Sequence, residues 1–231
     1  MPAAPDRDAP RSAACFVVRV WVPDRPGALG QVASRIGAVR GDVVGIDILE
    51  RGAGRAIDEL VVELPDAGLV DLLVQEIGQV DGVDVEDVRP VQGPAHDARV
   101  EALETAARLV EAASAGDLLG QLCADARREF DAEWCAVLSL GAEGSLLCGD
   151  GDLPPAAWLA AFLEGTRFSS SRVASPPPGP DDVAWAALPR SGAEVVLGRH
   201  GRPFRQRERN QLDVLARIAD LRLVEVSARV P

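Results

Sequence analysis

The sequence predicts an α+β protein of two domains, the first with the element order βαββαβ. Three observations support this prediction. The 231 residues are enough for two hydrophobic cores of ordinary size. Apolar residues in the first ninety positions switch between strand and helix spacing in that order. A Gly- and Pro-containing stretch then marks a linker. We therefore expect a disordered tail over 1–14, a first domain over 15–91, a linker over 92–98 and a second domain over 99–231.

The first domain opens with a strand, a tight turn and a helix. Phe16 to Val22 is rich in β-branched and aromatic residues, which favour a strand. In the turn, Pro26 lacks a backbone donor, and Gly27 can adopt angles that other residues reach only at a cost. The helix ends near Arg40-Gly41, with glycine just beyond the last turn. Its apolar face comprises Leu29, Val32, Ala33, Ile36 and Val39.

Three more strands and a second helix complete this domain. The strands are Val43 to Leu49, Ala56 to Leu64 and Val83 to Val88, and a glycine-rich hairpin joins the first two. The helix begins at Pro65-Asp66, and its apolar face comprises Leu69, Leu73, Ile77 and Val80. Two strand–helix–strand halves make a ferredoxin-like antiparallel sheet with both helices on one face. We expect alternating apolar residues on the uncovered face to favour a second copy.

A strand, a glycine turn and a helix N-terminus aim several backbone N–H groups at one spot, which suits a carboxylate. The run from Val20 to Gly30 resembles the signature turn of the ACT domain, and residues 16–91 have the element order of that family. The resemblance implies a dimeric module that binds a free amino acid. It assigns Asp24 to the ligand's amino group, although Asp24 could instead cap the helix or turn. The implied ligand-binding residues are Asp24, Arg25, Pro26, Gly27, Ala28, Leu29 and, closing the site from a second protomer, Val44, Gly45 and Ile46.

In the second half, Val100, Leu103, Ala107 and Val110 mark the apolar face of an amphipathic helix that ends at Ala115-Gly116. Asp117 is the expected cap of the next helix. The remaining expected elements are a hairpin of 134–140 with 145–148, a helix from Pro154-Pro155, a loop over 169–180, a hairpin of 183–188 with 194–199, and a long helix from about Arg205.

This half resembles a GAF domain, a sensory sheet flanked by helices. The residues that carry the resemblance are Ala187-Leu188-Pro189, Glu194 to Gly198, and Pro203-Phe204 leading into Glu208, Leu212, Leu215 and Ala216. The segment between Asp150 and Asp182 is shorter than the pocket wall of that family, so the resemblance does not imply an enclosed ligand site.

Composition excludes several classes of function. The net charge of −12 argues against a nucleic-acid-binding protein. No apolar run is long enough to cross a bilayer, and the first eleven residues lack the apolar core of a signal peptide, so a cytoplasmic location is expected. The cysteines have no metal-ligand spacing, and we expect no metal, cofactor or catalytic residues. Five arginines from Arg199 to Arg209 form a basic cluster, interpreted as a solvated face.

The sequence therefore predicts a non-catalytic, amino-acid-sensing regulator that acts as a homodimer with an unidentified downstream protein partner. Two alternatives stay open. One is a cysteine-dependent GAF reductase of free methionine sulfoxide, with Cys148 or Cys123 as the reactive thiol, although the acidic surroundings of Cys148 disfavour its thiolate. The other is a ligand-free dimerisation module.

Overall fold

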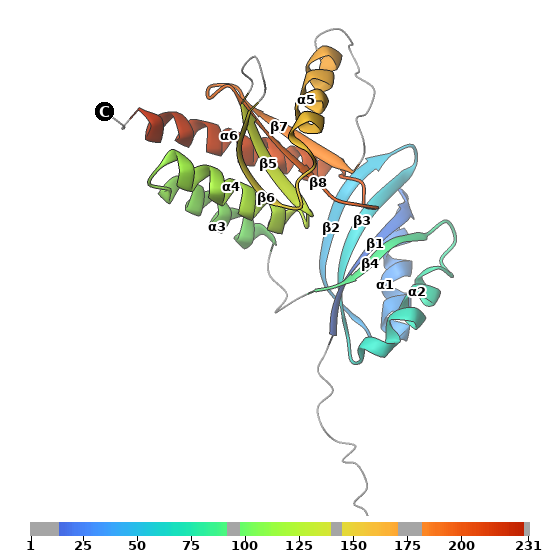
Figure 1. Ribbon diagram of the computed structural model, residues 1–231. Coiled ribbons are helices and arrows are strands. Elements are labelled where there is room, and N and C mark those ends of the chain that lie inside the picture. The colour runs from blue at the N-terminus through green and yellow to red at the C-terminus, as the bar shows by residue number, and fades with distance from the viewer. Residues whose placement is uncertain (1–13, 92–97, 140–144, 171–181, 229–231) are drawn as a thin grey trace, which may run out of the picture. The chain divides into compact units, whose positions relative to one another are not determined.

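The computed structural model describes residues 14–91, 98–139, 145–170 and 182–228. The chain divides into two compact units, Met1–Ala95 and His96–Pro231, which we describe separately (Figure 1). The predicted tail and linker fall almost wholly outside the described residues. The tail was predicted to end at residue 14 and the linker at residue 98, but Ala14 already belongs to a strand and Ala98 to a helix.

The first unit contains a four-stranded antiparallel sheet with the strand order β2-β3-β1-β4. Its elements are β1 (Ala14–Pro23), α1 (Ala28–Ala38), β2 (Asp42–Gly52), β3 (Arg55–Leu64), a short 3-10 helix η1 (Ala67–Leu69), α2 (Val70–Ile77) and β4 (Asp84–Pro90). The predicted order βαββαβ is confirmed, and so is the α+β class. Asp66 caps η1 by accepting a hydrogen bond from the Gly68 N–H at 2.9 Å.

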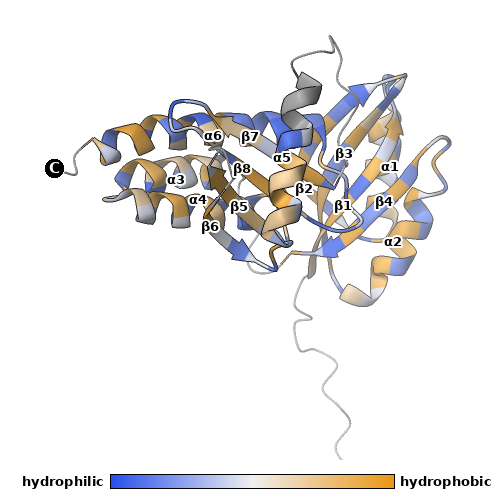
Figure 2. Cartoon of the chain, turned by 45° about the horizontal axis from the view of Figure 1, so that its top comes forward, coloured by the Kyte–Doolittle hydropathy of each residue, from blue (hydrophilic) through white to orange (hydrophobic). Residues whose placement is uncertain are grey.

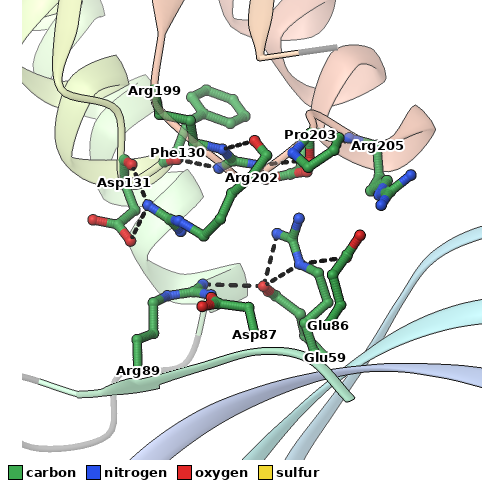
Figure 3. A network of polar contacts seen from close by, with 12 residues as sticks. Glu59, Glu86, Asp87, Arg89, Phe130, Asp131, Arg199, Arg202, Pro203 and Arg205 are labelled. Carbon is green, nitrogen blue, oxygen red and sulfur yellow. Dashed lines mark hydrogen bonds and ion pairs between the residues drawn. The ribbon is translucent and has the colours of Figure 1, made fainter. Parts of the chain in front are cut away.

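Period-2 alternation along the strands divides this sheet into two faces of different chemistry. Val18, Val20 and Val22 of β1 pack with residues of α1 and α2 in one apolar core. Both helices lie on the same face of this sheet (Figures 1 and 2). On the opposite face, Arg19 donates to Glu59 Oε1 at 2.8 Å. Arg89 donates to the same oxygen at 3.0 Å (Figure 3). This face was expected to be apolar, and that expectation is wrong at its centre, because the strand positions out of phase with the core carry an ion-paired network.

The glycine after α1 is required for space. Arg40, with a φ of 61°, adopts the left-handed conformation that ends the helix. A Cβ on Gly41 would lie 2.9 Å from Ile36 Cγ2, so the chain can pass this close to α1 only without a side chain.

The second unit is a four-stranded antiparallel sheet with the order β6-β5-β8-β7. Its elements are α3 (Ala98–Glu111), α4 (Ala115–Glu129), β5 (Trp134–Ser139), β6 (Leu146–Gly151), α5 (Ala156–Ser170), β7 (Val183–Leu188), β8 (Ala193–Gly198) and α6 (Gln206–Ser227). One face packs with α4 and α6 in the larger core, and the other face packs with α5. The predicted hairpin turn at 141–144 lies outside the described residues.

Three predictions about the start of this unit are wrong. Helix α3 ends at Glu111 and not at Ala115-Gly116, because these two residues open α4. Ser114, not Asp117, caps α4, because its hydroxyl accepts from the Asp117 N–H at 3.1 Å. The apolar stripe on α3, formed by Val100, Leu103, Ala107 and Val110, is exposed, with Leu103 71 % accessible. The helix instead buries Thr105 and Leu109.

Two further predictions about the second unit need correction. Helix α5 continues to Ser170, two residues into the predicted loop, and residues 171–181 lie outside the described part of the chain. Arg199, placed by the sequence on a solvated basic face, is only 3 % exposed. Its guanidinium donates to the Phe130 carbonyl oxygen at 2.6 Å (Figure 3). It also donates to Glu208 Oε1 at 2.7 Å.

Candidate ligand site at the first turn

The turn between β1 and α1 is anchored to the β2–β3 hairpin. The Asp24 N–H donates to the Gly54 carbonyl oxygen at 2.9 Å, and the Arg25 N–H donates to the Pro23 carbonyl oxygen at 2.8 Å. Gly27 precedes the helix with a φ of 86°, in the left-handed region that glycine adopts at little cost. The predicted glycine turn is therefore present, with Gly27 at the position that requires it.

The first turn of α1 offers backbone donors to a ligand. The first intrahelical bond runs from the Gln31 N–H to the Gly27 carbonyl oxygen at 3.1 Å. The Leu29 and Gly30 N–H groups precede that bond, so the helix itself supplies them with no carbonyl. Of the predicted donors, the Ala28 N–H is already used by the Arg25 carbonyl oxygen at 3.3 Å. The positive end of the helix dipole adds to the attraction for a carboxylate.

Side chains around the turn are in solvent. Asp24, Arg25 and Pro26 are exposed. No side chain caps α1, so the alternative in which Asp24 caps this helix is wrong. Arg25 Nη2 lies 3.5 Å from Gln31 Oε1 on the surface.

The predicted β2 residues are not brought to the turn within one chain. Ile46 pairs with Leu60, four residues along β3 from Ala56, which pairs with Val22 beside the turn. Four strand residues span about 13 Å. Gly45 has a packing role, since a Cβ there would lie 3.1 Å from Val61 Cγ2. Val44 and Ile46 are exposed on β2, an edge strand, where only a second copy could bring them to a ligand.

A buried carboxylate that the sequence analysis did not single out lies at the same end of the sheet. Asp58 on β3 pairs with Val20 of β1 and with Ile48 of β2. Directly paired residues point to the same face, so Asp58 lies on the face that α1 and α2 cover. It is 4 % exposed, and its Oδ1 has no hydrogen-bond donor among the described residues.

The electrostatics of Asp58 connect it with the turn. Burial raises the pKa of the Asp58 carboxyl above its ordinary value, because the charged form loses hydration. Arg51 opposes this rise in pKa, and the Asp24 carboxylate adds to it. The Asp24 carboxylate therefore acts on Asp58 across the turn, and an added cationic donor would offset the repulsion and supply the hydrogen bond that Asp58 Oδ1 lacks.

A signal for Asp58 is present in the sequence. The apolar residues of β3 recur at Ala56, Leu60, Val62 and Leu64, and Asp58 falls in phase with them. A charged residue in the buried phase of a strand carries a desolvation cost, and such costs gather at functional sites.

The described residues hold no other obvious site for a cofactor. No group of three or more His, Cys, Asp or Glu side chains is placed to bind a metal ion within them. No helix in this part of the chain is long and apolar enough to span a membrane. Three free cysteines of the second unit do meet, since Cys123 contacts the thiols of both Cys135 and Cys148.

Comparison with known proteins gives only distant similarities. No protein-family profile and no curated protein matches the chain. Among solved structures, the ACT domain from GTP pyrophosphokinase of Chlorobium tepidum is 16 % identical, with a TM-score of 0.29 over 35 % of this chain and all of that one. An uncharacterised protein from Thermotoga maritima is 23 % identical, with a TM-score of 0.29 over the same shares of the two chains.

For the second unit, the GAF domain from the phosphoenolpyruvate-protein phosphotransferase of Acinetobacter is 14 % identical. Its TM-score is 0.41 over 59 % of this chain and 99 % of that domain. Because these identities and TM-scores are low, we assign the architecture from the strand order and strand pairing of the structure itself. The chain is an α+β protein with a βαββαβ sheet unit followed by a second antiparallel sheet unit flanked by helices.

Proposed function

We propose that this protein is a non-catalytic regulator that binds a free amino acid at the turn between β1 and α1. The ligand carboxylate accepts hydrogen bonds from the Leu29 and Gly30 N–H groups, and the ligand ammonium group pairs with Asp24. A regulator without chemistry of its own requires a downstream protein partner that responds to the liganded state. The proposal includes a cytoplasmic location, where free thiols persist.

The observation that carries the proposal is the junction of opposite charges at one turn. A helix N-terminus attracts an anion, and two carboxylates attract a cation beside it. A free amino acid carries both charges on adjacent groups. Inorganic phosphate would satisfy the helix but would be repelled by the two aspartates.

The cysteines argue against the alternative of a cysteine-dependent reductase. Contact with the Cys135 thiol and burial raise the pKa of the Cys123 thiol far above its ordinary value. Burial raises the pKa of Cys148 to about 11. A reactive cysteine needs a lowered pKa, because the thiolate is the nucleophile. These thiols are therefore better suited to packing than to reducing a sulfoxide.

An amino acid should raise the melting temperature of the wild-type protein in a screen against the twenty common amino acids. A ligand at a hundred times its dissociation constant adds about 2.7 kcal/mol to the free energy of unfolding. Asp24→Ala removes a charge-assisted hydrogen bond and should weaken binding by about 1.5–3 kcal/mol. Asp42→Ala, also at an exposed aspartate of this unit, should leave binding unchanged. If no amino acid stabilises the protein, the proposed function fails, and equal binding by Asp24→Ala would place the site elsewhere.

The proposed dimer uses the β2 edge of the first unit. Val44 and Ile46 leave apolar side chains exposed on an edge strand of eleven residues, with Ile46 48 % accessible. Exposed apolar edges favour pairing with another chain. Because the sheet face opposite the helices carries ion pairs, this edge is the better candidate for the apolar contact expected from the sequence.

Light scattering should give twice the 24.3 kDa monomer mass for the wild type. Ile46→Lys should halve that mass, because a lysine on an edge strand opposes pairing. Leu103→Lys is the matched control, since it places the same charge on the exposed apolar stripe of α3. A dimer that survives Ile46→Lys and dissociates with Leu103→Lys would contradict the proposed interface.

A further inference from the structure

We infer that Asp58 makes the site at the turn selective for amino acids with a cationic side chain, of the class of lysine, ornithine and arginine. This inference rests on the proposed function and names its ligand class.

The proposed site carries two carboxylates, those of Asp24 and Asp58. A zwitterionic amino acid brings one ammonium group, which the exposed Asp24 can accept. Asp58 then stays buried with an oxygen that lacks a donor. A second cationic group on the ligand supplies that donor and neutralises the second carboxylate. Arg51 acts on Asp58 electrostatically, but no hydrogen bond or ion pair between them occurs in the described residues.

An apolar surface lies beside Asp58. Ile48 is the residue of β2 that pairs with Asp58. It is exposed, and direct pairing places Ile48 and Asp58 on the same face of the sheet. A side chain with an aliphatic stem and a charged tip matches this pair, since the stem covers the isoleucine while the tip reaches the carboxylate.

Without a ligand, the buried Asp58 carboxylate is expected to lower the stability of the fold. Replacement of both partners of a buried polar interaction can be neutral, but an unpaired buried charge destabilises the fold. Val20 and Leu60, its neighbours on this face, are fully buried apolar residues, so Asp58 contributes no evident packing that an apolar residue could not supply. A residue that lowers the stability of the free protein and has no internal hydrogen-bond partner fits a role in ligand binding.

The test uses pairs of ligands that differ only in the cationic group: lysine against norleucine, and arginine against citrulline. Calorimetric titration of the full-length wild type should show the cationic member of at least one pair binding about 10- to 100-fold more tightly. Asp58→Asn, which keeps the shape and removes the charge, should abolish that preference. Asp42→Asn should retain it. Unliganded Asp58→Asn should also melt at the same or a higher temperature than the wild type at pH 7.

The outcomes separate this inference from the proposed function. If neutral and cationic members bind equally to the wild type, the selectivity fails and the amino-acid site stands. The selectivity also fails if Asp58→Asn keeps the preference, or if that variant melts well below the wild type, which would reveal a structural partner for the carboxylate. If no amino acid binds at all, both proposals fail together.

Discussion

Arg199→Met should lower the free energy of unfolding of the second unit by about 3–5 kcal/mol, the usual loss when one partner of a buried ion pair is removed. The Arg199 guanidinium donates to three backbone carbonyl oxygens, those of Phe130, Arg202 and Pro203, and to Glu208. It also lies 4.0 Å from the centre of the Phe204 ring. Methionine keeps the apolar stem but removes the Arg199 hydrogen bond from each of these acceptors and the guanidinium charge from beside Glu208, which keeps its hydrogen bond from the Arg205 N–H.

Urea unfolding followed by tryptophan fluorescence would measure this loss, since three of the four tryptophans lie in the second unit. Arg217→Met on the exposed side of α6 is the matched control and should change stability by less than about 0.5 kcal/mol. If the two variants unfold at the same urea concentration, the buried arginine contributes nothing to the junction of β8 and α6.

Asp125→Asn should destabilise the same unit by about 2–4 kcal/mol at pH 7, less than a fully buried pair because its arginine partners are partly exposed. Asp125 is fully buried and accepts hydrogen bonds from Arg108 at 3.1 Å, from Gln121 at 2.7 Å and from Arg128 at 2.5 Å. The hydrogen bond from Arg108 links α3 to α4, because Arg108 lies on α3 and Asp125 on α4. Asparagine keeps the shape and removes the charge that binds both arginines.

The pH dependence provides a second readout. Burial alone would raise the pKa of Asp125, but hydrogen bonds from Arg108, Gln121 and Arg128 hold it below its ordinary value of 3.8. A carboxyl whose pKa is lowered by folding contributes stability that is full above its unfolded pKa and is lost as the pH falls through its folded pKa. The difference between wild type and Asp125→Asn should therefore shrink below pH 3.8. Glu104→Gln, which removes only an exposed partner 3.9 Å from Arg108, should cost about 0.5 kcal/mol or less.

The first unit was predictable because its pattern is local. Strand alternation, helix spacing and the turn residues around Gly27 each follow from neighbouring positions, and together they leave one simple sheet topology. The left-handed conformation of Gly27 follows from the need for a tight turn before α1. The Gly41 contact with Ile36 could not be foreseen, because it depends on how closely the chain passes the helix.

The wrong predictions about burial concern contacts between distant segments. The spacing of the apolar stripe on α3 shows which residues share a face but not whether another element covers that face. Arg199 stands among arginines in a charged run, and its burial depends on the Phe130 carbonyl 69 residues away. Asp58 could have been found, since it interrupts the buried phase of β3. Its relation to Asp24 required the pairing of β1 with β3.

The most direct test of the proposed ligand site is a titration of the ¹⁵N-labelled protein with the amino acid that stabilises it most, followed residue by residue. The account predicts that the amide signals of Leu29 and Gly30 move most, with those of Asp24 and Asp58 close behind, and that the second unit changes little. Signals that move only in the second unit, or that do not move at a saturating concentration, would contradict an amino-acid site at the turn before α1.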